Sequence, residues 1–335
     1  MKKIVILGCG GWGIALAILL HDNGNSVAMW SPFENEVSSL SAARGNEKLL
    51  PGIKLADDIA ITGDIGTVSD ADVVIIATPS VAVRSTAERL CGVVNDRAII
   101  VDVAKGFDEQ SLERLSEVIA RALPNNPIAA LSGPSHAEEV ARGVPTSLVA
   151  ASADISVAEA VQDFVSGETM RVYVNTDIIG VEVGGALIYI IALACGIGDG
   201  LGVGDNTRAA LMTRGLTEIA RLGCAMGADK DTFAGLAGLG DLIVTCTSMH
   251  SRNRRFGIEI GRGKSVQEAL DSVGMTVEGY HAVKTAHQLA QKYGVNMPIA
   301  NECYNVLYCG APVDTIVSRL MSRPKRHELD TNWLK

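Results

Sequence analysis

Residues 3–13 read KIVILGCGGWG, and this stretch decides the fold of the first part of the chain. The apolar run Ile4–Leu7 has the length and composition of a buried strand, and it leads directly into Gly8, Gly10 and Gly13. A strand followed by Gly-x-Gly-x-x-Gly and a helix forms a loop that binds the diphosphate of a dinucleotide. The first glycine permits a tight turn, the second lets the phosphates approach the backbone, and the third lets helix and strand pack closely. The sequence therefore predicts a dinucleotide-binding loop at Gly8–Gly13.

Short β-branched runs alternate with helical patterns over the first half of the chain, whereas strand signals vanish after about residue 175. This order predicts a doubly wound parallel sheet of the Rossmann type over residues 1–176 and an all-helical, substrate-binding domain over residues 177–335. The predicted strands are Ile4–Leu7, Ser26–Trp30, Val73–Ala77, Ala98–Val103, Ile128–Leu131, Thr146–Ala150 and Arg171–Val174.

The composition limits the classes of partner. With 335 residues, 47% of them hydrophobic and 20% charged, the chain has material for two packed cores and does not resemble a disordered protein. The formal net charge of −9 argues against a nucleic-acid-binding or anionic membrane-binding surface. An anionic substrate remains compatible with this charge, because a local cationic pocket is enough to bind it.

The cysteines and the most apolar segment indicate the cellular compartment and whether the chain enters a membrane. Seven cysteines are scattered without Cys-x-x-Cys or Cys/His ligand spacing, which predicts reduced thiols, a cytoplasmic protein and no metal site. The uncharged segment Val183–Gly198 is shorter than the roughly 20 residues that span a membrane. It is therefore predicted to be a buried core helix without membrane insertion.

The residue that would read the cofactor ribose is not evident from the sequence. An acidic residue at the end of the second strand binds a ribose 2′-hydroxyl, and an arginine nearby accommodates a 2′-phosphate. Here the residues after Trp30 are Ser31, Pro32, Phe33 and Glu34. Glu34 is a candidate, but the choice between NAD and NADP stays open.

Several segments together resemble the bacterial NAD(P)-dependent glycerol-3-phosphate dehydrogenases over nearly the whole chain. The resemblance implies interconversion of dihydroxyacetone phosphate and sn-glycerol 3-phosphate with NAD(H) or NADP(H), for glycerophospholipid synthesis, by a homodimer. The segments are GCGGWGIALA (8–17), AKGFDE (104–109), LSGPSHAEEV (131–140), RVYVNTDIIGVEVGGAL (171–187), GLGVGDNTRAALMTRGLTEI (200–219), GLAGLGDLIVTCTS (235–248), SRNRRFG (251–257), VEGY (277–280) and MPI (297–299).

The same resemblance implies roles for individual residues. Matching positions in the family contact the cofactor at Gly8, Gly10, Gly11, Trp12, Gly13, Phe33, Lys105, Ala137, Arg252 and Glu278. Matching positions contact the substrate at Lys105, Gly133, Ser135, Asp241, Ser251, Arg252 and Asn253. Arg254 and Arg255 adjoin this run and are interpreted as solvated surface charges.

Two of these groups also have a chemical rationale. Lys105 follows a predicted strand, at the edge where open sheets bind ligands, and its charge would stabilise a substrate oxyanion or polarise a carbonyl. Asp241 and Thr245 are four residues apart, so a helix places them on one face toward one ligand. The resemblance assigns Lys105, Asp241 and Thr245 to the active site.

The chain departs from the family pattern at the residue regarded as the general acid/base. The family helix runs Gly-Gly-Ala-Leu-Lys-Asn, whereas this chain has GGALIY at 184–189, so that Ile188 and Tyr189 replace the lysine and the asparagine. Isoleucine has no proton to transfer, and loss of a positioned acid/base costs about 10²–10⁴ in rate. A smaller departure is Gly11, where the family usually has serine.

Three accounts of Ile188 stay open. The substitution is incidental in an ordinary enzyme, Lys105 or Tyr189 has taken over the proton transfer, or the chain is a catalytically weak relative that still binds cofactor and triose phosphate. Tyr189 is the poorer substitute, because it points about 100° away around the helix. A dehydrogenase for another small phosphorylated or carboxylated substrate is a further alternative.

Overall fold

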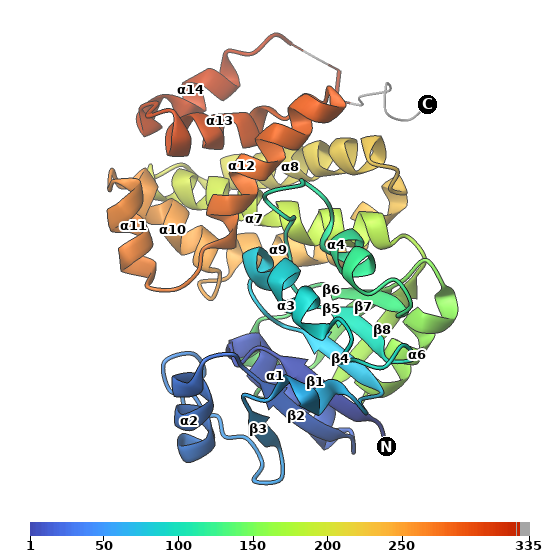
Figure 1. Ribbon diagram of the computed structural model, residues 1–335. Helices are drawn as coiled ribbons and strands as arrows, with labels where there is room; N and C mark the ends of the chain where they lie inside the picture. Colours follow the sequence, from blue (N-terminus) through green and yellow to red (C-terminus); the bar gives the residue numbers. More distant parts are fainter. Residues whose placement is uncertain (326, 329–335) are drawn as a thin grey trace. The chain divides into compact units, whose positions relative to one another are not determined.

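Figure 1 shows a computed structural model of the chain, which describes residues 1–325 and 327–328. The chain divides into two compact units, Met1–Ile178 and Ile179–Lys335. The first unit contains a mostly parallel sheet with helices, and the regular elements described in the second are helical. The predicted fold class, a Rossmann-type sheet followed by a helical region, is therefore confirmed.

The sheet of the first unit has eight strands in the order β3-β2-β1-β4-β5-β6-β7-β8. β1 pairs in parallel with both β2 and β4, so the strand order reverses beside β1. Ligands of open sheets bind at the carboxyl ends of the strands at such a reversal. The strands are β1 Lys3–Leu7, β2 Ser26–Trp30, β3 Ala60–Thr62, β4 Val73–Ile76, β5 Ile99–Asp102, β6 Ile128–Ser132, β7 Thr146–Ala151 and β8 Met170–Asn175.

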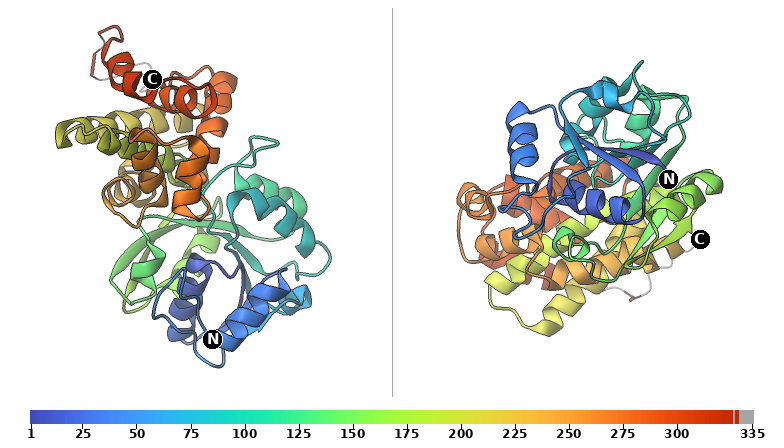
Figure 2. Two further views of the ribbon diagram at one scale, coloured as in Figure 1. Left: turned by 90° about the vertical axis from the view of Figure 1, so that its left-hand side faces the viewer. Right: turned by 90° about the horizontal axis from the view of Figure 1, so that it is seen from below.

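Helices cover both faces of this sheet (Figure 2). Successive side chains of β1 enter opposite cores: Ile4 and Ile6 pack into one cluster, and Val5 and Leu7 into the other. Burial on both faces explains why β1 is continuously apolar rather than alternating. The helices are α1 Gly11–Asp22, α2 Glu34–Ala43, α3 Val83–Leu90, α4 Leu115–Ala122, α5 Ala137–Val140 and α6 Ile155–Val165.

One strand pair departs from the predicted parallel sheet. β7 runs antiparallel to β6, although it pairs in parallel with β8. Only residues 133–145 join β6 to β7, and they contain the four-residue helix α5. This connection turns the chain back instead of carrying a long crossover helix over the sheet, which is what parallel neighbours need. Strand β3 was also not predicted, because it is three residues long and lies at the sheet edge.

The second unit is built around one long buried helix, α7. It spans Ile178–Gly200, and 78% of its most apolar 18-residue window is buried. By length and composition α7 is apolar enough to cross a membrane, but its burial is that of a core helix. The other helices are α8 Asp205–Ala225, α9 Asp241–Thr247, α10 Arg252–Gly261, α11 Val266–Val273, α12 Glu278–Tyr293, α13 Pro298–Tyr308 and α14 Ile316–Met321.

Helices α7 and α10 approach so closely that their backbones touch. A Cβ atom on Gly257 would lie 2.1 Å from the carbonyl oxygen of Leu193, and one on Gly196 would lie 2.1 Å from that of Arg254. Gly200 and Gly261 repeat this contact one turn later. Small residues four positions apart on both helices therefore allow the approach, and they fix α10 against the core helix.

We predict that Gly257→Ala lowers the free energy of unfolding by about 1–3 kcal/mol or more, because the added methyl overlaps backbone atoms that cannot move independently. Gly63→Ala is the matched control, since its Cβ would meet other atoms only at 3.7 Å or beyond. Urea denaturation measures both. Equal effects of the two substitutions would contradict this account of the α7–α10 contact.

Candidate active site

The loop between β1 and α1 has the shape that a dinucleotide diphosphate requires. Gly8 adopts φ +125°, and a Cβ there would lie 2.6 Å from the carbonyl oxygen of Ala77. A Cβ on Gly13 would lie 2.3 Å from the carbonyl oxygen of Gly8, so both glycines are required by close packing. Above Gly10, the N-cap of α1, no atom lies within 4 Å of such a Cβ. The open surface at Gly10 and the first N–H groups of α1 fit a bound diphosphate.

Three predicted substrate residues converge where two neighbouring strands end. Lys105 follows β5, and Gly133 follows β6. The Lys105 Nζ donates a hydrogen bond of 3.1 Å to the carbonyl oxygen of Gly133. The Ser135 hydroxyl donates to the same oxygen, also at 3.1 Å. The ammonium group of Lys105 is thereby positioned at the carboxyl edge of the sheet.

The remaining predicted cofactor residues of the first unit flank the glycine loop. A Cβ on Gly11 would lie 3.8 Å from the Cβ of Ala137, the first residue of α5. This is an ordinary van der Waals distance, so Gly11 has space for the serine that the family usually has there. Trp12 is partly buried in the first turn of α1, and Phe33, before α2, is 60% exposed.

Glu36 is a candidate cofactor residue that sequence reasoning missed. The buried Ser31 follows β2, and its hydroxyl donates to a Glu36 carboxylate oxygen at 2.6 Å. Burial, and secondarily the charge of Glu36, raise the pKa of Cys9 to about 12, which indicates that Glu36 lies near the glycine loop. Glu36 is the third residue of α2, a position from which glutamate turns back toward the preceding residues. A glutamate at the third position of the helix after β2 was therefore the sequence signal that could have identified Glu36.

In the second unit, Asp241 and Thr245 share one face of α9. The Thr245 hydroxyl donates to an Asp241 carboxylate oxygen at 3.0 Å, and the two residues are 2% and 5% exposed. The predicted shared face is therefore present. A π-helical turn, Leu236–Gly240, directly precedes Asp241, and such turns are frequent at functional sites.

The predicted phosphate-binding run forms the N-terminus of α10, a helix that was not predicted from the polar sequence SRNRRFG. Ser251 is the N-cap and accepts a hydrogen bond from the backbone N–H of Arg254. The amide oxygen of buried Asn253 accepts from the N–H of Gly279, next to Glu278. Arg252 is exposed, and its guanidinium donates to the carbonyl of Thr276. A helix N-terminus with an exposed arginine suits a phosphate dianion.

The interpretation of Arg254 and Arg255 as solvated surface charges is wrong. The Arg254 side chain is only 12% exposed and forms an ion pair of 2.8 Å with Asp199 near the end of α7. Arg208 of α8 pairs with the same carboxylate. Arg255 is also partly buried. The ion pair of Arg254 with Asp199 could not be recognised in the sequence, because the two residues are 55 positions apart.

Ile188 lies in the core helix α7, one turn after Gly184. It is fully buried. One turn earlier, a Cβ on Gly184 would lie 2.6 Å from the carbonyl oxygen of Ala237, and two turns later Gly196 approaches Arg254. Ile188 is about 40° from Gly184 around the helix, so these two residues lie on the same side of α7. At this position the chain offers an apolar wall without charge or exchangeable proton.

Comparison with known proteins bears on the whole chain. Residues 3–158 match the sequence profile described as NAD-dependent glycerol-3-phosphate dehydrogenase N-terminus. Residues 177–318 match the profile of the C-terminus of the same family. Together the two profiles include every candidate residue described above.

Individual relatives agree with the profiles. A protein from Moorella thermoacetica named glycerol-3-phosphate dehydrogenase [NAD(P)+] is 51% identical over 334 residues, covering 99% of both chains. One of that name from Bacillus subtilis is 48% identical, covering 98% of this chain and 97% of its own. The crystal structure of glycerol-3-phosphate dehydrogenase from Coxiella burnetii superimposes with a TM-score of 0.93 at 37% identity, covering 96% of this chain and 99% of that chain. The chain belongs to the NAD-dependent glycerol-3-phosphate dehydrogenase family.

Proposed function

We propose that this protein interconverts dihydroxyacetone phosphate and sn-glycerol 3-phosphate by hydride transfer with a nicotinamide dinucleotide. Near-full-length identity of about half to dehydrogenases of that name is the observation that carries the proposal. The glycine loop of the first unit and the α10 N-terminus of the second supply the two phosphate-binding features that such a reaction needs.

The first unit holds the cofactor and stabilises charge on the substrate. Backbone N–H groups at the start of α1 bind the diphosphate across Gly8–Gly13. When bound, the dinucleotide supplies or accepts the hydride at nicotinamide C4. Lys105, held by the carbonyl of Gly133, stabilises the negative charge that develops on the substrate oxygen.

The second unit holds the substrate phosphate. Arg252 provides two charge-assisted hydrogen bonds, and the N–H groups of the first turn of α10 provide further donors. Because the amide oxygen of Asn253 accepts from Gly279, its NH₂ group donates to the phosphate. Asp241, oriented by Thr245, accepts a hydrogen bond from a substrate hydroxyl.

We expect Arg252→Ala to raise KM for dihydroxyacetone phosphate at least about tenfold, because a charge-assisted hydrogen bond contributes roughly 1.5–3 kcal/mol. Arg262→Ala, an exposed arginine at the other end of α10 that pairs with Glu259, is the matched control. Steady-state kinetics with each variant give the result. An unchanged KM in Arg252→Ala would favour a substrate without this phosphate contact, as in the alternative of another dehydrogenase.

Proton transfer is the step that Ile188 weakens. Reduction of the ketone delivers a hydride to carbon and requires a proton at oxygen, and the buried isoleucine has none. We expect Ile188→Lys to raise the rate of NADH or NADPH oxidation with dihydroxyacetone phosphate by about 10²–10⁴. Ile188→Leu is the matched control and should give no gain, because it preserves volume without adding a proton.

Two other outcomes of these rate measurements would change the interpretation of Ile188. A high rate in the unaltered chain with no gain in Ile188→Lys would contradict the proposed weakness, and Lys105 would then be the proton donor to test. Inactivity of all variants with intact cofactor binding would favour the alternative, a cofactor-binding relative without turnover.

The residues after β2 favour NAD over NADP. Glu34 and Glu36 are exposed acidic residues there, and residues 31–36 contain no lysine or arginine. Carboxylates accept hydrogen bonds from a ribose 2′-hydroxyl and repel a 2′-phosphate. Ser31 orients the Glu36 carboxylate, which makes Glu36 the stronger candidate.

Cofactor titrations test this preference without relying on turnover. The fluorescence of bound nicotinamide should give a lower Kd for NADH than for NADPH in the unaltered chain. Glu36→Gln should weaken NADH binding and strengthen NADPH binding, because it removes the acceptor charge, whereas Glu34→Gln should change either less. Tighter binding of NADPH by the unaltered chain would contradict the assignment.

The setting of the reaction is also a proposal. The seven cysteines are free thiols in the structure, and burial raises the pKa of Cys303 as well as that of Cys9. Seven free thiols, of which Cys91 and Cys309 are exposed, support a compartment that keeps thiols reduced, the cytoplasm. The family resemblance supports a homodimer that provides sn-glycerol 3-phosphate for glycerophospholipid synthesis.

A further inference from the structure

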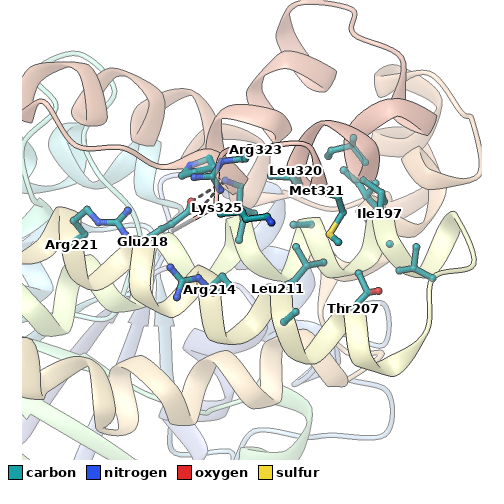
Figure 3. A pocket seen from close by; sticks show the side chains of 18 of the residues that line it. Ile197, Thr207, Leu211, Arg214, Glu218, Arg221, Leu320, Met321, Arg323 and Lys325 are labelled. Atoms are coloured by element: carbon teal, nitrogen blue, oxygen red, sulfur yellow. Dashed lines mark hydrogen bonds between the residues drawn. The ribbon is translucent and has the colours of Figure 1, made fainter. Parts of the chain in front are cut away.

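A cavity of about 650 Å³ lies within the second unit, lined by residues that have no role in the site described above (Figure 3). Its walls come from α7, α8, the start of α13, α14 and the described residues Arg323, Lys325 and His327 after α14. Pockets that enclose small organic ligands have volumes of about 300–1,000 Å³. The cavity therefore has the size of a ligand site.

The two ends of this cavity differ in chemistry. Ile197, Leu211, Leu320 and Met321 form an apolar end, at the right of Figure 3. Basic side chains gather toward the other end, around one carboxylate, Glu218. The basic lining residues are Arg214, Arg221, Arg323 and Lys325, and His327 also lines the cavity.

The charge of Glu218 is engaged by the protein itself. Both carboxylate oxygens accept hydrogen bonds of 3.0 Å from the backbone N–H of Ile299, in the first turn of α13. Glu218 is 4% exposed, and burial raises its pKa to about 7. Near neutral pH this group therefore offsets only part of the surrounding positive charge. Four basic side chains against one carboxylate leave the polar end of the cavity with an excess of positive charge. Arg214 and Arg221 also donate hydrogen bonds to the backbone carbonyls of Glu328 and Asn296, which hold their side chains in place.

From this arrangement we propose that the cavity binds a single-chain amphiphile, an alkyl or acyl chain with a phosphate monoester head group. The apolar end takes the chain, and the arginines and Lys325 take the head group. A dianion suits several basic residues better than a monoanion does, and arginine binds phosphate with two parallel hydrogen bonds. The proposal does not depend on the dehydrogenase activity, because no residue of the cavity takes part in it.

Isothermal titration of the full chain with alkyl phosphates, below their micelle concentrations, tests both ends. Decyl phosphate should bind, and affinity should rise by up to about fourfold for each methylene added from butyl to decyl. Inorganic phosphate and decyltrimethylammonium should bind at least tenfold more weakly than decyl phosphate. Equal affinities along the chain series, or for the cationic amphiphile, would overturn the proposal.

Charge reversal locates the head group. Arg214→Glu and Lys325→Glu should each weaken decyl phosphate at least tenfold, whereas Arg262→Glu makes the same change of charge away from the cavity and should have little effect. Thermal unfolding with and without decyl phosphate gives a second readout, since a ligand that binds the folded state raises Tm. Equal affinities in all three variants would overturn the assignment.

Sedimentation of the same variants tests whether a second copy of the chain, rather than an amphiphile, occupies the cavity. If Arg214→Glu halves the sedimenting mass and leaves decyl phosphate binding unchanged, the cavity is covered by a second copy of the chain and the proposal is wrong. An unchanged mass with weakened binding supports the amphiphile site.

Discussion

The backbone contact between α7 and α10 is the constraint on which the residues proposed to bind the substrate in the second unit depend. Gly196 and Gly257 let the two helices approach until a single methyl group on either would overlap a carbonyl oxygen. This approach fixes the direction of α10, and its first turn carries Ser251, Arg252 and Asn253. The ion pair of Arg254 with Asp199 holds the same turn from the side. Residues outside the proposed phosphate site therefore fix the position of the first turn of α10.

The burial of Ile188 in the core helix α7 matters for proton transfer in the proposed reaction. Ile188 is fully buried in a close-packed helix, so a small movement of the helix does not replace it with another side chain. The fold tolerates the apolar residue because an isoleucine needs no hydrogen-bond partner. Reduction of the substrate ketone, in contrast, needs a proton donor within hydrogen-bond distance of the reacting oxygen. Nothing in the structure explains why isoleucine stands at this position.

Features encoded locally could be predicted from the sequence. The glycine loop, the strand β1 and the shared face of Asp241 and Thr245 follow from spacing alone, and the structure contains all three. Lys105 was placed correctly at the sheet edge because its strand was recognisable. The roles assigned to these residues remain proposals, as they came from resemblance to the family.

Features that depend on distant contacts could not be predicted. The antiparallel β7 depends on how a short connection turns back. Arg254 looked solvated because its partner Asp199 lies 55 residues away. The cavity requires five segments of the second unit to come together, and none of them has a binding motif.

The most direct test of the central claim is a single turnover of the unaltered protein, saturated with NADH and mixed with dihydroxyacetone phosphate in H₂O and in D₂O. The account predicts saturable binding of both ligands, slow loss of NADH absorbance and a further slowing in D₂O, because proton delivery limits the reaction when Ile188 occupies the donor position. Rapid loss of absorbance at equal rates in the two solvents would contradict it.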